Sequence, residues 1–160
     1  MINEQKKKRL RRSMMFLNGQ KPSLIKDPYI YKADSLMFDL EDAVAVTAKD
    51  TARFSLYHAL TTIDYRGAER VVRINGLDTD LWKEDIRCVV AADTELIRIP
   101  KCENKEMVLE VEAEIEKAEK EFKVTVKRQM NAKETAQADA DAINLGNLGS
   151  VKENLVLPTE

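Results

Sequence analysis

The chain has 160 residues, 44% of them hydrophobic and 34% charged, with 26 Lys and Arg against 28 Asp and Glu. This length suits one domain with a core, and the near-balance of charge excludes a whole-protein electrostatic case for binding nucleic acid or a membrane. No apolar run approaches the ~20 residues of a membrane-spanning helix, and two cysteines are too few for a disulfide framework, so we expect a cytoplasmic protein with reduced thiols.

Residues 1–12 form a basic segment, with six Lys and Arg side chains against the single acid Glu4. A segment of this kind can bind phosphate or nucleic acid. No aromatic residue interleaves with the charges, as it would in a single-strand binding surface. We therefore interpret 1–12 as a solvated leader into the first strand.

Short apolar runs then alternate with stretches of helical spacing as far as residue 122. We predict strands over 13–17, 35–40, 70–75 and 95–99. We predict a short helix within 23–31, limited by Pro28, and longer helices over 48–63, 78–92 and 104–122.

Two of these helices carry features that the structure can test. In 48–63, Phe54, Tyr57 and His58 fall near one another on a 3.6-residue wheel. In 78–92, Asp78 or Thr79 is placed to cap the N-terminus.

Four βα units of this kind indicate parallel strands joined by right-handed crossovers. A doubly wound sheet and a piece of a (β/α)8 barrel both fit, and both bind ligands at the carboxyl edge of the strands. The texture changes after Phe122, because 127–160 contains no aromatic residue. We expect 123–160 to be a poorly packed or disordered tail, in which 124–126 is a candidate fifth strand.

Arg73 is the first candidate binding residue, because a guanidinium at the end of a buried strand is costly to desolvate unless it meets an anion. One interpretation is that Arg73 binds a substrate carboxylate through its planar fork. The other is a structural ion pair with Glu41 or Asp42.

Asp39, Glu41 and Asp42 form an acidic cluster after the second predicted strand. Carboxylates this dense can help to hold Mg²⁺ or a metal-bound water. Alternatively, one caps the next helix and another pairs with Arg73. His58, Cys88 and Cys102 have no partner at a catalytic or metal-binding spacing, and we interpret them as packing or half-exposed residues.

Four segments resemble the β subunits of bacterial citrate lyase, within the wider citrate lyase/malyl-CoA lyase family. They are Arg12–Phe16, Tyr31–Val44 (which contains FDLEDAV), Val72–Asn75 (VRIN) and Ile97–Lys101 (IRIPK). Their order and spacing match the family across roughly 9–122, and we expect the resemblance to end near Phe122 and to leave 123–160 unmatched.

The resemblance implies a TIM barrel and a Mg²⁺-dependent cleavage of citryl-carrier protein to oxaloacetate and acetyl-carrier protein. It implies that Arg73 binds a substrate carboxylate, that Asn75 is a neighbouring polar group, and that Asp39, Glu41 and Asp42 line the site. It also implies partners, namely the α subunit and the acyl-carrier (γ) subunit, with a homo-oligomer as a further expectation. No catalytic residue and no metal ligand can be assigned, since the family's Mg²⁺ ligands lie on later strands.

A barrel of this type needs about 250 residues. We therefore expect 13–122 to be the N-terminal half of a TIM-barrel lyase domain, in a truncated, frameshifted or fragmentary product that is inactive alone. Two alternatives remain open. One is a non-catalytic fragment that binds the other lyase subunits, and the other is a relative that acts on malyl-CoA or another acyl-CoA.

Overall fold

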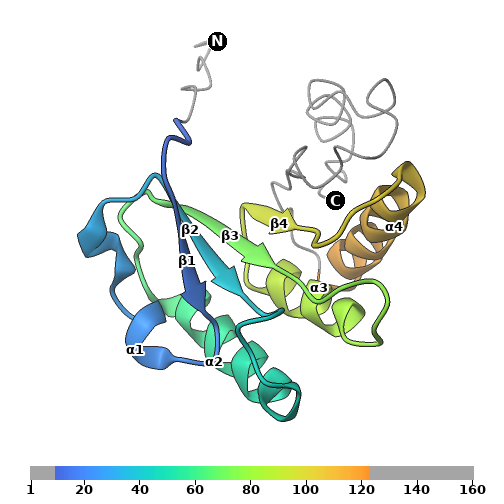
Figure 1. The fold of residues 1–160 in the computed structure, drawn as a ribbon, viewed down its shortest axis with the longest axis horizontal. Coiled ribbons are helices and arrows are strands. Elements are labelled where there is room, and N and C mark those ends of the chain that lie inside the picture. The colour runs from blue at the N-terminus through green and yellow to red at the C-terminus, as the bar shows by residue number, and fades with distance from the viewer. Residues whose placement is uncertain (1–9, 123–160) are drawn as a thin grey trace.

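The computed structural model describes residues 10–122, and Figure 1 shows four strands in one sheet with helices packed against it. The strands are β1 (Met14–Asn18), β2 (Ser35–Asp39), β3 (Glu69–Arg73) and β4 (Leu96–Arg98). All neighbouring strands are parallel and follow one another in chain order. The four predicted strands are thus confirmed to within about a residue or two at each end.

A helical segment follows each strand. The longer helices are α2 (Lys49–Thr62), α3 (Trp82–Ala91) and α4 (Lys105–Phe122). The predicted helix within 23–31 is divided into α1 (Pro22–Ile25) and the 3₁₀ helix η1 (Pro28–Tyr31), because Pro28 lacks the N–H that a continuous helix would need. A second 3₁₀ helix, η2 (Val46–Ala48), leads directly into α2.

The strand order decides between the two architectures that the sequence left open. A doubly wound sheet reverses its strand order at a switch point, whereas here the order β1-β2-β3-β4 never reverses. Successive right-handed crossovers then place every helix on the same side, and α2 and α3 lie along one face in Figure 1. The described residues therefore form part of a (β/α)8 barrel.

The core lies between the sheet and these helices. Leu36, Phe38 and Val72 point into it from β2 and β3, and each is fully buried. The helices contribute aliphatic side chains at helical spacing, and Phe38 also packs edge to face against Tyr65, with ring centroids 5.3 Å apart. The buried helix residues are Ala52, Leu56, Ala59 and Leu60 of α2, Trp82, Ile86, Val89 and Val90 of α3, and Val108, Val111, Ile115 and Ala118 of α4.

The structure confirms one of the two helix features and corrects the other. Phe54, Tyr57 and His58 lie together on α2, with the Phe54 and His58 ring centroids 4.4 Å apart, and they are on its exposed side. Neither Asp78 nor Thr79 caps α3, which begins only at Trp82. The Thr79 hydroxyl donates instead to the carbonyl of Gly76 and closes the preceding turn.

The described end of the basic segment, residues 10–12, is exposed and forms two ion pairs. Arg11 pairs with the buried Glu69 at 2.7 Å, and Arg12 pairs with Asp34 at 2.8 Å. The hydrogen bonds from Arg12 lower the pKa of Asp34 to about 2. These two pairs fasten the chain to the amino-terminal edge of the sheet. Within 10–122, no helix is both long and apolar enough to cross a membrane.

Candidate functional site

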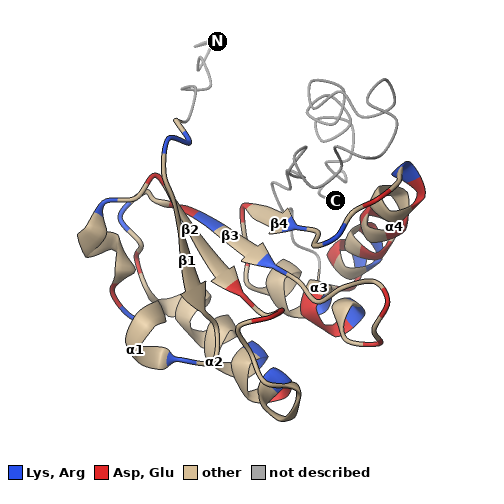
Figure 2. Cartoon of the chain, viewed as in Figure 1, with Lys and Arg blue, Asp and Glu red and all other residues tan. Residues whose placement is uncertain are grey.

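The carboxyl edge of the sheet gathers the polar residues that the sequence singled out. Asp39 is the register partner of Arg73, and Arg73 is the partner of Arg98. Figure 2 shows acidic residues at and after the end of β2 and basic residues at the ends of β3 and β4. Because parallel strands end at one edge, segments far apart in sequence meet here.

Arg73 lies at the centre of this group, with its side chain 17% exposed. Its Nε and Nη2 donate to the two carboxylate oxygens of Asp39 at 2.9 and 2.7 Å. Its Nη1 lies 2.9 Å from Glu41 Oε2, and Nη2 lies 3.8 Å from Asp42 Oδ2. The expected pairing with Glu41 and Asp42 is present, and the bidentate partner is Asp39. The hydrogen bonds that Arg73 donates to Asp39 raise the pKa of Arg73.

Asp39 is buried and also orders the loop that follows β2. Its Oδ1 accepts the backbone N–H of Glu41 at 2.9 Å, and its Oδ2 accepts that of Ala43 at 3.2 Å. Burial favours the neutral acid, but the hydrogen bonds from Arg73 and these two amides outweigh it and lower the pKa of Asp39. Asp39 is therefore a carboxylate, which both orients Arg73 and caps the turn.

Glu41 extends the same network toward the rim. Its Oε2 faces Arg73, whereas Oε1 is buried and accepts no hydrogen bond among the described residues. Lys101 Nζ, on a side chain that is 68% exposed, lies 3.3 Å from this Oε1. Glu41 raises the pKa of Lys101, so the rim holds a second cation. Asp42 is 70% exposed and projects beyond the group.

Asn75, the other predicted binding residue, is held by a partner that the sequence did not single out. Its backbone N–H and its Nδ2 both donate to Asp85 Oδ2, at 2.8 and 2.6 Å. Asp85 Oδ1 accepts from Arg53 Nη1 at 2.8 Å. Both Asn75 and Asp85 are buried, so Asn75 fixes the loop after β3 to α2 and α3.

Phe16 supplies the aromatic surface beside the site. Its ring lies 5.5 Å from the Arg73 guanidinium carbon and 5.9 Å from that of Arg98, and the residue is 53% exposed. The register of β1, β2 and β3 places Phe16 on the same face of the sheet as Arg73. Phe16 directly precedes the buried Leu17 in β1, so the two side chains point to opposite faces of the sheet. In the sequence, this alternation was the only indication that Phe16 lies on the exposed face.

The arrangement leaves Arg73 able to bind a further anion. A guanidinium has five N–H donors, and Asp39 and Glu41 engage three of them. The two that remain are on the terminal nitrogens, which is the geometry that a carboxylate accepts. Lys101 adds a mobile cation at the rim.

A divalent metal does not fit the acidic cluster as it stands. Asp39 uses both oxygens for Arg73 and backbone amides, and Glu41 lies between Arg73 and Lys101. Both carboxylates are therefore committed to other partners. Within residues 10–122, no group of three His, Cys, Asp or Glu side chains is arranged to hold a metal ion.

The cysteines and the histidine lie outside this group. Cys102 is buried, and burial raises the pKa of the Cys88 thiol to about 12, which keeps it protonated. His58 lies against the rings of Phe54 and Tyr57 on α2. Their interpretation as packing or surface residues is consistent with these positions.

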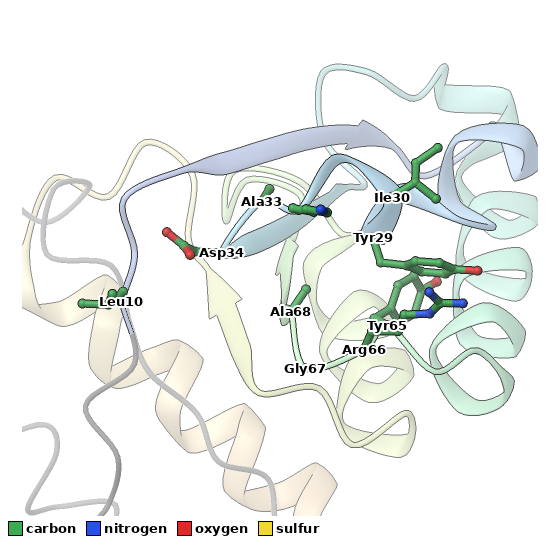
Figure 3. Close-up of a pocket in the computed structure, with 10 residues that line it drawn as sticks. Leu10, Tyr29, Ile30, Ala33, Asp34, Tyr65, Arg66, Gly67 and Ala68 are labelled. Carbon is green, nitrogen blue, oxygen red and sulfur yellow. The ribbon is translucent and has the colours of Figure 1, made fainter.

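A cavity of about 770 Å³ opens at the opposite, amino-terminal edge of the sheet (Figure 3). Arg66 stacks over the ring of Tyr29 there, 4.5 Å from its centroid. The Tyr65 hydroxyl is occupied by the carbonyl of Ile25, and the Asp34 carboxylate by Arg12. The residues that the sequence singled out lie at the other edge, so the candidate site remains the Arg73 group at the carboxyl edge.

Comparison with known proteins places this geometry in context. A family model described as HpcH/HpaI aldolase/citrate lyase matches residues 12–147. The match therefore continues beyond residue 122, although the motifs that carry the resemblance do not. The expected tail at 123–160 lies outside the described residues.

Curated relatives are more similar in sequence than solved structures. The citrate lyase subunit beta of Leuconostoc mesenteroides subsp. cremoris is 46% identical over 154 residues, which is 95% of this chain and 51% of the relative. The citrate lyase subunit beta of Escherichia coli K12 is 44% identical over 73% of this chain and 39% of its own length. A (3S)-malyl-CoA thioesterase of Cereibacter sphaeroides is 39% identical over 56% of this chain and 32% of its own. The chain spans about half the length of the Leuconostoc relative.

Among solved structures, CitE of Mycobacterium tuberculosis with magnesium, acetoacetate and coenzyme A has a TM-score of 0.55 at 20% identity, over 92% of this chain and 61% of that one. The citrate lyase beta subunit of the same organism, complexed with oxaloacetate and magnesium, has a TM-score of 0.54 at 21% identity, over 92% and 74%. At these identities the likeness shows the fold.

Proposed function

Because the chain belongs to the HpcH/HpaI aldolase/citrate lyase family, we propose that residues 10–122 form the carboxylate-binding half of a site that cleaves a citryl thioester. The Arg73 group carries this proposal: an arginine fixed by Asp39 and Glu41, with two terminal N–H donors left for an anion. The substrate class is a citryl group on an acyl-carrier subunit, and the products are oxaloacetate and an acetyl thioester.

Cleavage of the citryl thioester defines what these residues must do. The tertiary hydroxyl of the citryl group loses its proton and becomes the ketone of oxaloacetate. The bond to the carbon next to the thioester carbonyl breaks, and its electron pair forms the enolate of the acetyl thioester, which then takes up a proton. Arg73 holds a carboxylate at the oxaloacetate end and fixes the direction of the bond that breaks.

The proposal assigns no proton-transferring residue and no metal ligand to residues 10–122. Magnesium accompanies the M. tuberculosis relatives. The described acids of this chain serve Arg73 and the loop after β2 instead. We propose that cleavage needs groups outside 10–122, so that this part binds and orients the substrate.

Calorimetric titration of the full chain with oxaloacetate tests the proposal. We expect saturable binding that Arg73→Lys weakens by roughly tenfold or more, because lysine keeps the charge but loses the fork, and a charged hydrogen bond contributes about 1.5–3 kcal/mol. Arg87→Lys is the matched control, since Arg87 pairs with Glu121 on the helical side of the sheet. Absent binding, or equal affinity in both variants, would contradict the proposal.

A second candidate function is a non-catalytic module that binds the α and carrier subunits. This function is favoured because the buried carboxylates of Asp39 and Asp85 form structural ion pairs with arginines. Among the described residues, no group of carboxylates is arranged to bind a metal ion. Titration with oxaloacetate, combined with co-purification of the other subunits, separates the two, because this chain is expected to be inactive alone under either function. Oxaloacetate binding that depends on Arg73 supports the lyase half-site, and co-purification without that binding supports the module. A preference for a coenzyme A thioester over the carrier thioester would favour the malyl-CoA alternative.

A further inference from the structure

Lys49 is a buried cation that the carboxylate-binding account does not use. It is the first residue of α2 and is 6% exposed. A positive charge at a helix N-terminus opposes the helix dipole, and burial adds a desolvation cost. Within residues 10–122, no carboxylate lies within ion-pair distance of its ammonium group. The carboxylates of Asp85, Asp39, Glu41 and Asp42 attract this charge from farther away, and its direct contacts are of another kind.

Those contacts are backbone carbonyls of the loop after β2. Lys49 Nζ donates to the carbonyl oxygen of Leu40 at 2.5 Å and to that of Glu41 at 2.6 Å. Charge-assisted hydrogen bonds of this length are among the stronger ones in proteins. Lys49 therefore fastens the two residues that directly follow Asp39.

Glu41 is then held from both sides of its backbone. Asp39 Oδ1 accepts its N–H at 2.9 Å, while Lys49 donates to its carbonyl oxygen. With the main chain fixed, the side chain places Oε2 2.9 Å from Arg73 Nη1 and leaves Oε1 buried beneath Lys101. Asp39 holds one side of the Arg73 guanidinium from β2, and the second carboxylate that holds it, Glu41, lies on a loop that Lys49 locks.

One helical turn later, Arg53 holds the loop after β3 through Asp85. Arg53 pairs with Asp85, and Asp85 accepts both N–H groups of Asn75. The first two turns of α2 therefore connect to the loops after β2 and after β3. Lys49 contacts its loop directly, whereas Arg53 acts through Asp85.

We propose that Lys49 is a positioning residue, which fixes Glu41 and through it the carboxylate-binding orientation of Arg73. This inference rests on the proposed function for its effect on binding. Its structural step, the locking of the Glu41 backbone, stands on the hydrogen bonds alone. The two can therefore be tested separately.

Amide hydrogen exchange, measured by NMR on the full chain, tests the structural step. In Lys49→Met, which keeps the length and removes the donors, we expect the Glu41 and Ala43 amides to exchange at least about tenfold faster. The Val72 amide in β3 should be unchanged. Lys117→Met is the matched control, because Lys117 is exposed and pairs only with Glu114 on its own helix.

Oxaloacetate titration of the same variants tests the effect on binding. Lys49→Met should weaken binding by roughly tenfold or more, although Arg73 is intact, while Lys117→Met binds as the unaltered chain does. If the unaltered chain binds no oxaloacetate, the proposed function fails, and the exchange rates still decide the role of Lys49. Unchanged rates at Glu41 and Ala43, or equal acceleration at Val72, would overturn the positioning role.

A measurement on the unaltered chain covers the case in which Lys49→Met does not fold. The Lys49 ammonium nitrogen should show scalar couplings across its hydrogen bonds to the carbonyl carbons of Leu40 and Glu41. Both couplings would support the proposal, and the absence of both would overturn it.

Discussion

At the scale of single residues, the register of β2 and β3 sets the chemistry of the site. Asp39 and Arg73 are direct partners across the two strands, so their side chains meet on one face without any loop rearrangement. An ion pair with Glu41 or Asp42 was one of the two interpretations of Arg73 that the sequence left open, and both contacts are present. It did not predict Asp39 as the bidentate partner, because one sequence does not fix the register between two strands.

Buried charges were the other part that the sequence could not show. Lys49 and Asp85 lie in amphipathic helices, where a charged residue is ordinarily read as solvent-exposed. Both are buried because each turns back to the loop that precedes its own helix, where the partner is Leu40 for Lys49 and Asn75 for Asp85. Only the folded chain brings these partners together.

The dependence of the free energy of unfolding on pH, at acid pH, tests the ion pair between Asp39 and Arg73. An unfolded Asp has a pKa of about 3.9, and that of folded Asp39 is lower. Ionised Asp39 therefore stabilises the fold above about pH 3.9, and this contribution is lost as the pH falls through the folded pKa. We expect Asp39→Asn to lower the free energy of unfolding in urea at pH 7 by more than at pH 3. Asp80→Asn, at an exposed position, should show no such difference, and an equal loss at both pH values for Asp39→Asn would contradict the assignment.

At the scale of elements, α2 shows why helical spacing predicts a helix more reliably than its buried face. The predicted range 48–63 is close to Lys49–Thr62. The aromatic group is nevertheless exposed, and the sheet is covered by smaller aliphatic residues, Ala52, Leu56 and Ala59. Small side chains allow the helix to approach the sheet closely, whereas Phe54 and Tyr57 pack against His58.

Paired alanine substitutions test this orientation of α2. Leu56 is fully buried and Phe54 is 67% exposed. We expect Leu56→Ala to lower the free energy of unfolding by about 2–5 kcal/mol. Phe54→Ala should change it by about 0.5 kcal/mol or less. Chemical denaturation measures both, and a larger loss for Phe54→Ala would mean that the helix is turned the other way.

At the scale of the whole molecule, four consecutive parallel strands place all site residues on one edge. The alternation of strands and helices in the sequence predicts this edge, and the family motifs predict that the site lies there. Composition could not distinguish a barrel piece from a doubly wound sheet, since both alternate strands and helices. The unbroken strand order resolves that choice, because it keeps the helices on one face and leaves the other face to Phe16, Arg73 and Arg98.

The central claim is that Arg73, held on this inner face, binds a carboxylate of the substrate. The most direct test is to record the arginine Nε–H signals of the full chain by NMR during titration with oxaloacetate. The signal of Arg73 is assigned as the one that is lost in Arg73→Lys. We predict that the Arg73 signal shifts saturably and more than any other, while the dimethyl ester of oxaloacetate, which lacks the charge, leaves it unchanged. An Arg73 signal that does not move at saturating oxaloacetate would contradict the account.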